Sequence, residues 1–182
     1  MDNLKEKTLS QEIKYNGRIL NLRVDTVLLP NGKQAKREVV EHSGGVCVVA
    51  FDENDNLLMV KQFRYPYGEI TLEIPAGKIN YGEDPKECGA RELTEETGYV
   101  AKELTKLAHL YPTPAYDSEI IHIYLAKQLT KSSQHLDEDE FLSVERVPFD
   151  KAVEMVMNNE IPDSKTQIAI LKVYALKNMG KL

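Results

Sequence analysis

The stretch Gly77–Tyr99 reads GKINYGEDPKECGARELTEETGY, and it is the most informative part of the chain. Pro85 stands where the first residue of a helix belongs, and Gly98 stands where a helix ends in a left-handed residue. The spacing therefore predicts a helix from Asp84 to Thr97. Because strand-like segments flank this helix on both sides, the pattern favours an α/β fold.

Three glutamates crowd one side of this predicted helix. Glu92, Glu95 and Glu96 fall within a stripe about 100° wide, because each residue of an α-helix turns the chain by about 100°. Like charges at these spacings destabilise an isolated helix by roughly 0.2–0.5 kcal/mol per pair. A solvated acidic face is one interpretation. The other is a site for a hard divalent cation, because Mg²⁺ and Ca²⁺ prefer carboxylate oxygens, and Mg²⁺ in turn favours a phosphate substrate.

The segments before this stretch carry strand signals. Residues 19–30 and 33–42 read ILNLRVDTVLLP and KQAKREVVEH, and the Asn31-Gly32 pair between them predicts a hairpin. The glycines that follow Ser43 mark a boundary, so we expect residues 1–43 to form a β-hairpin arm and residues 44–182 the main domain. The apolar run GVCVVAF that opens the main domain is typical of a strand buried on both faces.

The segments after the stretch complete the predicted architecture. ELTKLAHLY, EIIHIYLA and FLSVERV are strand-like, and two helices follow at Phe149–Asn158 and from about Asp163 to Asn178. ITLEIPAG, just before Gly77, is a further short strand. This order predicts a mixed sheet covered by helices, an α/β or α+β sandwich.

Composition narrows the class of protein. The 182 residues suit one ordinary domain with a small appendage, and the net charge of −6 argues against a nonspecific nucleic-acid binder. No apolar run reaches the roughly 18 residues that span a bilayer. The opening MDNLKEKTLSQE is too polar for a signal peptide, so we expect a cytoplasmic protein without a membrane partner. Cys47 and Cys88 form no CxxC pair, which makes a cysteine-based zinc site or disulfide framework unlikely to explain the fold.

The spacing of the central stretch resembles the Nudix box of the hydrolases that cleave nucleoside-diphosphate-linked substrates. Gly77 is followed after five residues by Glu83, and after seven more by Arg91-Glu92-Leu93-x-Glu95-Glu96-x-Gly98-Tyr99. Every fixed position of the box is matched. The last position is usually aliphatic, and a tyrosine there is similar to the subgroup that cleaves ADP-ribose.

The resemblance implies a fold, a cofactor and metal ligands. The fold is a Nudix α/β/α sandwich with a mixed sheet, preceded by the N-terminal β arm. The cofactor is Mg²⁺, with Mn²⁺ as the alternative, held chiefly by Glu92 and Glu96 with help from Glu95 and the backbone carbonyl of Ala76. A metal in this place would neutralise the diphosphate and activate water. For Glu83 and Arg91, we favour a structural salt bridge over contact with substrate.

The resemblance to bacterial ADP-ribose pyrophosphatases extends over nearly the whole chain and implies the substrate. A proline about 16 residues after the last glycine of the box is similar to that subgroup, and here it is Pro114. The same alignment implies that Arg37 and Arg64 contact the substrate, since an arginine fork suits phosphate oxygens. Glu38 and Glu119 are candidates for the ribose hydroxyls or the metal shell. A surface ion pair is the competing interpretation for each of these four charged residues.

The acidic run from Asp137 to Glu140 has two interpretations. Taken alone, four consecutive acids indicate a solvated loop. In ADP-ribose pyrophosphatases a loop at this place supplies a glutamate that acts as general base on the attacking water. The position similar to that glutamate is Glu138, and Glu140 is the fallback.

The resemblance also implies a homodimer in which the N-terminal arm is exchanged and adenine stacks between chains. Four tyrosines are available for stacking, and the sequence does not choose among them: Tyr15, Tyr65, Tyr67 and Tyr116. The expected reaction is Mg²⁺-dependent hydrolysis of ADP-ribose to AMP and ribose 5-phosphate. The alternatives are a Nudix hydrolase of GDP-mannose or NADH, an ADP-ribose sensor without activity, and a purely structural partner protein.

Overall fold

A computed structural model describes residues 4–138 and 140–182 of the chain. The contacts divide the chain into two compact units. The N-terminal unit contains the chain up to Gly44 together with Tyr111–Ile120. The sandwich unit contains Gly45–Leu110 and Ile121–Leu182. The boundary at residues 43 and 44 and the dimer role of the arm stay predictions.

The N-terminal unit is a three-stranded antiparallel sheet in the order β1-β2-β3. Its strands are β1 (Lys7–Asn16), β2 (Asn21–Leu28) and β3 (Gln34–Glu41). The hairpin predicted at Asn31-Gly32 joins β2 to β3, and Gly32 has the positive φ of 80° that such a turn requires. The sequence analysis assigned no separate strand to β1. All its side chains are exposed, so no buried face marks it in the sequence.

The segment Tyr111–Ile120 follows the free edge of β3. The backbone N–H of Val40 donates to the carbonyl of Tyr116 at 2.8 Å, and the N–H of Ser118 donates to the carbonyl of Val40 at 3.0 Å. These two bonds satisfy backbone groups that an edge strand otherwise exposes. They explain why the segment belongs to this unit although it is remote in sequence.

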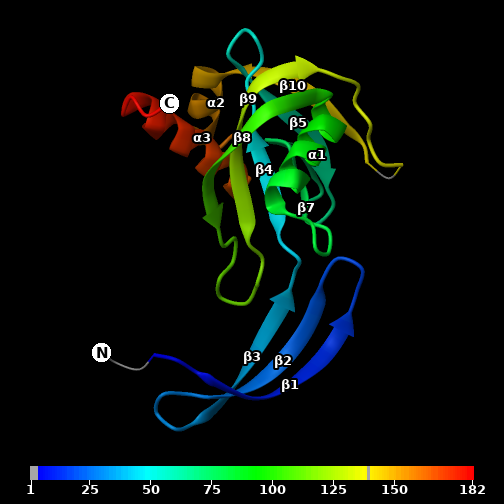
Figure 1. Cartoon of the computed structure of the whole chain (residues 1–182). Coiled ribbons are helices and arrows are strands. Elements are labelled where there is room, and N and C mark those ends of the chain that lie inside the picture. The colour runs from blue at the N-terminus through cyan, green and yellow to red at the C-terminus, as the bar shows by residue number, and fades with distance from the viewer. Residues whose placement is uncertain (1–3, 139) are drawn as a thin grey trace. The chain divides into compact units, whose positions relative to one another are not determined.

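The sandwich unit contains two sheets (Figure 1). The four-stranded sheet has the order β7-β4-β9-β8, with β4 and β9 parallel and its other pairs antiparallel. The three-stranded sheet has the antiparallel order β10-β5-β6. The strands are β4 (Gly45–Val49), β5 (Asn56–Arg64), β6 (Glu69–Glu73), β7 (Ala76–Lys78), β8 (Tyr99–Leu110), β9 (Ile121–Lys131) and β10 (Leu142–Pro148). The mixed sheet confirms the prediction.

Helices cover both faces of the four-stranded sheet (Figure 1). They are α1 (Pro85–Thr97), α2 (Phe149–Met157) and α3 (Ser164–Asn178). Alternate residues of β4 point to opposite faces. Cys47 and Val49 pack in the cluster that contains α2 and α3, whereas Val46 and Val48 pack in the cluster that contains α1. The α/β/α sandwich is therefore confirmed.

The helix α1 begins and ends where the sequence predicted. The Asp84 carboxylate accepts hydrogen bonds from the N–H groups of Lys86 and Glu87 at 2.8 and 3.3 Å. Gly98 ends the helix in the left-handed conformation with φ 71°, and its N–H donates to the carbonyl of Thr94. These caps satisfy backbone groups that a helix cannot satisfy itself. Within the described residues, no helix is both long and apolar enough to cross a membrane.

Candidate functional site

The candidate site is built around buried glutamates of α1. Glu92 and Glu96 are only 7% and 2% exposed. Glu96 accepts a hydrogen bond of 2.9 Å from the backbone N–H of Ala76, at the start of β7. A Cβ atom at Gly77 would lie 1.9 Å from the carboxyl carbon of Glu92. Only a glycine therefore allows the loop to approach α1 this closely.

Arg91 holds the glutamates of the helix and the preceding loop together. Its guanidinium donates to the two carboxylate oxygens of Glu83 at 2.8 and 3.1 Å. Its Nη1 atom lies 2.8 Å from a carboxylate oxygen of Glu95 and 2.8 Å from one of Glu92. The structural salt bridge between Glu83 and Arg91 that the sequence analysis favoured is confirmed. One cation thus offsets the repulsion among three acids.

The protonation of the two buried acids follows from their surroundings. Burial raises the pKa of Glu92 to about 6, although Arg91 opposes this change. Burial raises the pKa of Glu96 to about 8, against the hydrogen bond from Ala76, and the negative charges of Glu92 and Glu140 add to the rise. A second positive charge at this place would favour the ionised form of both.

The donor set fits a divalent cation in chemistry. Carboxylate oxygens in a shared, poorly solvated pocket are the ligands that Mg²⁺ prefers. Across residues 4–138 and 140–182, however, no three His, Cys, Asp or Glu side chains already converge as a metal-binding group. The reason is visible: Glu92 and Glu95 are paired with Arg91, and Glu96 is bonded to the N–H of Ala76. Metal binding would require these carboxylates to exchange partners.

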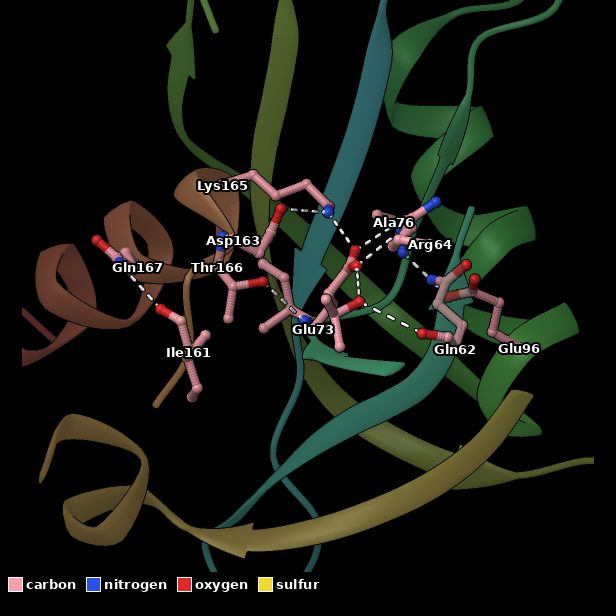
Figure 2. A network of polar contacts seen from close by, with 12 residues as sticks. Gln62, Arg64, Glu73, Ala76, Glu96, Ile161, Asp163, Lys165, Thr166 and Gln167 are labelled. Carbon is pink, nitrogen blue, oxygen red and sulfur yellow. Dashed lines mark hydrogen bonds and ion pairs between the residues drawn. The ribbon is translucent and has the colours of Figure 1, made fainter. Parts of the chain in front are cut away.

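A second polar network lies beyond Ala76 (Figure 2). Its centre is Glu73, which receives a bidentate pair of hydrogen bonds from Arg64 at 2.7 and 2.6 Å. Thr71 donates to the same carboxylate at 2.6 Å. Lys165 forms an ion pair with Glu73 and donates to Asp163 at 3.0 Å. Burial tends to raise the pKa of Glu73, but these donors lower it to about 2, so the residue is a carboxylate at neutral pH.

A cavity of about 520 Å³ opens beside this network. Arg64 is on its wall and is also close enough to Glu96 for their charges to interact. The cavity and the acidic cluster of α1 are therefore neighbours within one unit. The lining residues are Arg64, Pro66, Tyr67, Glu69, Thr71, Glu73, Pro162, Asp163, Ser164 and Lys165.

Comparison with known protein families decides what this arrangement is. A model described as the NUDIX domain matches residues 41–168. The chain belongs to the Nudix family. A second model, described as the nucleoside diphosphate sugar hydrolase N-terminal domain, matches residues 6–40.

Nudix proteins similar to this chain carry several names. An "ADP-ribose pyrophosphatase" of Bacillus subtilis (strain 168) is 45% identical over 93% of each chain. A "Methanol dehydrogenase activator" of Bacillus methanolicus is 43% identical over 91% of this chain and 90% of its own. A "GDP-mannose pyrophosphatase" of Klebsiella pneumoniae is 32% identical over 74% of this chain and 73% of its own.

A solved Nudix-like structure agrees with these relatives. It is titled "Crystal structure of ADP compounds hydrolase" and is 26% identical. It matches with a TM-score of 0.85 over 98% of this chain and 97% of its own. The family and these relatives identify the chain as a Nudix pyrophosphohydrolase.

Several predicted Nudix site residues lie together in the sandwich unit. Glu92, Glu95 and Glu96 share α1, with Ala76 bonded to Glu96. Arg64 is on β5, with its guanidinium on Glu73. The bonds to Glu73 use its Nε and Nη2 atoms.

The acidic run gives different settings to its two candidate bases. Glu140 is half-buried, and its charge reaches both Glu92 and Glu96. Glu138 is exposed. Neither observation assigns the base.

The remaining predicted site residues lie in the N-terminal unit. Arg37 of β3 donates to the carboxylate of Glu6 at 3.0 and 2.5 Å, which is the surface ion pair weighed against a substrate contact. Glu38 is exposed on the same strand. Pro114 lies in a turn, and Glu119 pairs with His42 at 3.3 Å. The four candidate tyrosines are all exposed, two in each unit.

The sequence analysis did not name Glu73 or Lys165. The signal for Glu73 is a carboxylate in the apolar strand segment LEI, where an ionised group is unexpected without a partner. Its partner Lys165 is 92 residues away, so no local pattern joins the two.

Proposed function

We propose that this chain hydrolyses ADP-ribose to AMP and ribose 5-phosphate in the presence of Mg²⁺. The observation that carries the proposal is the pair of buried carboxylates, Glu92 and Glu96, placed against the Gly77 loop. The names of the relatives at 45% identity and in the solved structure support the substrate class. A homodimer in the cytoplasm, as the resemblance implies, is part of the same proposal.

The roles proposed for the acidic cluster follow from its chemistry. Glu92, Glu95, Glu96 and the carbonyl of Ala76 would hold the cation, with Mn²⁺ as a substitute. When bound, the cation neutralises phosphate charge and makes water a stronger nucleophile. Glu138, with Glu140 as the fallback, would accept the proton of the attacking water. The water oxygen then forms a bond to phosphorus as the bridging P–O bond breaks.

The proposed substrate contacts use residues of both units. Arg64 would contact a phosphate through the part of its guanidinium that the Glu73 pair does not use, since arginine has five N–H donors. Arg37, Glu38, Glu119 and Pro114 would contact the nucleoside or the ribose. For Arg37, this requires exchange of Glu6 for the substrate.

GDP-mannose is the second candidate substrate. The observation that favours it is the group of relatives named "GDP-mannose pyrophosphatase" at 31–33% identity. These cover about three quarters of the chain, whereas the Bacillus subtilis relative covers 93%. Coverage therefore places ADP-ribose first.

The test is a substrate panel with product separation by chromatography. The panel contains ADP-ribose, GDP-mannose, NADH, diadenosine polyphosphates and dNTPs, each with and without Mg²⁺. We expect AMP and ribose 5-phosphate to form fastest from ADP-ribose, and only with the metal. Faster cleavage of GDP-mannose would replace the substrate while keeping the acidic cluster. Binding of ADP-ribose without any product, measured by calorimetry, would favour a sensor.

A further inference from the structure

Gln62 on β5 carries a buried hydrogen-bond donor with no role in the network around it. Among the described residues, its Nε2 atom has no hydrogen-bond partner and is inaccessible to solvent. Its backbone carbonyl, in contrast, receives a bond of 3.4 Å from Thr71. A buried amide without an acceptor costs about 1–3 kcal/mol, so such a group needs an explanation.

The surroundings of Gln62 supply an acceptor. A cavity of about 260 Å³ is lined by Gln62, Phe63, Glu140, Phe141 and Leu142. Strand β10 places Leu142 directly opposite Gln62. The register therefore brings Glu140, two residues before Leu142, to the cavity that contains the Gln62 side chain.

Glu140 is held loosely by its own turn. Its N–H donates to the carbonyl of Asp137 at 3.0 Å, whereas its carboxylate accepts only a long bond of 3.4 Å from the N–H of Asp137. The carboxylate has lone pairs to spare, because an ionised glutamate accepts about four hydrogen bonds. Its charge also contributes to the raised pKa of Glu92 and Glu96.

The strand geometry connects this cavity with the acidic cluster. Gln62 and Arg64 are two residues apart on β5, so their side chains lie on the same face of the strand. Arg64 interacts electrostatically with Glu96. Gln62 is thus a neutral donor between a basic residue of the site and an acidic turn (Figure 2 shows Gln62, Arg64 and Glu96).

We propose that Gln62 is a positioning residue whose side-chain amide donates to the Glu140 carboxylate and fixes the acidic turn beside the α1 glutamates. The catalytic relevance of this contact rests on the proposed function, whereas the contact itself does not. A neutral amide suits the task, because it holds a carboxylate without adding a cation that would compete with a metal.

The contact is tested first by hydrogen exchange, which needs no substrate. The probe is the backbone amide of Glu140 at neutral pH, followed in wild type, Gln62→Leu and Gln62→Glu. We expect protection to fall about tenfold in Gln62→Leu, as for loss of a hydrogen bond to a charged group, and further in Gln62→Glu. The swap Gln62→Glu with Glu140→Gln restores an amide and a carboxylate in reversed places, so part of the protection returns.

A matched control separates this effect from general damage to β5. Lys61→Met removes the neighbouring side chain, which forms an exposed ion pair of 3.0 Å with Glu145. We expect exchange at Glu140 to be unchanged in this variant. Unchanged exchange in Gln62→Leu would overturn the proposal, and so would equal loss in Lys61→Met.

Kinetics test the positioning role. We expect Gln62→Leu to lower kcat for ADP-ribose by about ten- to a hundredfold, as for residues that orient ligands of a metal site, with KM unchanged. A raised KM with unchanged kcat would mean direct contact with substrate and would overturn the positioning role. A wild-type chain inactive on the whole panel would overturn the proposed function while leaving the exchange result valid.

Discussion

Individual carboxylates in the sandwich unit have opposite electrostatic settings. Burial raises the pKa of Glu92 and Glu96, whereas the hydrogen bonds from Arg91 lower the pKa of Glu83 to about 2. The first two are costly acids that a cation would stabilise, and Glu83 is an acid that already has its cation. The difference separates the residues proposed to bind metal from the residue that shapes the loop.

Glu96→Gln tests the first group. The amide keeps the shape of the side chain but removes the negative charge, so we expect kcat with ADP-ribose and Mg²⁺ to fall at least about a hundredfold. The melting temperature should stay close to that of wild type, because an uncharged group is easier to bury. Glu87→Gln, on the exposed side of the same helix, is the control and should keep full turnover. Near-normal turnover in Glu96→Gln would contradict the metal assignment.

Gly77→Ala tests the close approach of the loop. The new methyl group would lie 1.9 Å from the Glu92 carboxyl carbon, so we expect the carboxylate to be displaced and activity to be largely lost. Gly82→Ala is the comparison, because Gly82 has a φ of 77° with open space around its Cβ position. It should cost about 1 kcal/mol of unfolding free energy through backbone strain, with Glu92 undisturbed. Equal activity in the two variants would contradict the argument.

At the scale of elements, α3 is tied to the segment that leads into β7. The hydroxyl of Thr166, which is fully buried, accepts a hydrogen bond of 3.1 Å from the backbone N–H of Ile74. Asp163 caps the same helix by accepting from the N–H of Thr166 at 3.0 Å. These bonds fix the chain two residues before Ala76, so a helix on one face of the sheet supports the site on the other.

Thr166→Val tests this link. It keeps the shape of the side chain but leaves the Ile74 N–H buried without an acceptor, so we expect a loss of about 1–3 kcal/mol in unfolding free energy. Thr166→Ser keeps the hydroxyl and should lose clearly less. Denaturant titration of both proteins measures the difference. If Thr166→Val were as stable as Thr166→Ser, the hydrogen bond would not be the link.

Elements with local signals were predictable from the sequence, and contacts between distant elements were not. Asp84, Pro85 and Gly98 marked both ends of α1, and Asn31-Gly32 marked the turn before β3. The pair of Glu73 and Lys165 joins β6 to α3 across 92 residues, and only the tertiary fold brings the two side chains together. The acidic cluster was predictable because its members share one helix.

Across the whole molecule, ion pairs around buried carboxylates set the response to acid. Glu73 and Glu83 both have a pKa of about 2 in the folded chain, against the ordinary 4.5. Their contribution to stability is therefore complete above about pH 4.5 and is lost as the pH falls toward 2, because the unfolded chain takes up protons first.

Glu83→Gln measures this contribution. We expect its free energy of unfolding to be lower than that of wild type at pH 7 and to fall less steeply between pH 4.5 and 2. Denaturant titrations at pH 7, 4.5 and 3 give the comparison. Parallel curves for the two proteins would show that the ion pair with Arg91 does not contribute to acid sensitivity.

The two cysteines give the sandwich a chemical record of its own opening. Cys47 packs with α2 and α3, Cys88 packs with α1, and both are fully buried. Burial raises the pKa of each thiol to about 12, so neither reacts as a thiolate in the folded chain at neutral pH. A thiol reagent therefore reads two separate clocks in one molecule. Modification of Cys88 before Cys47 would date the departure of α1 from the sheet, independently of the opposite layer.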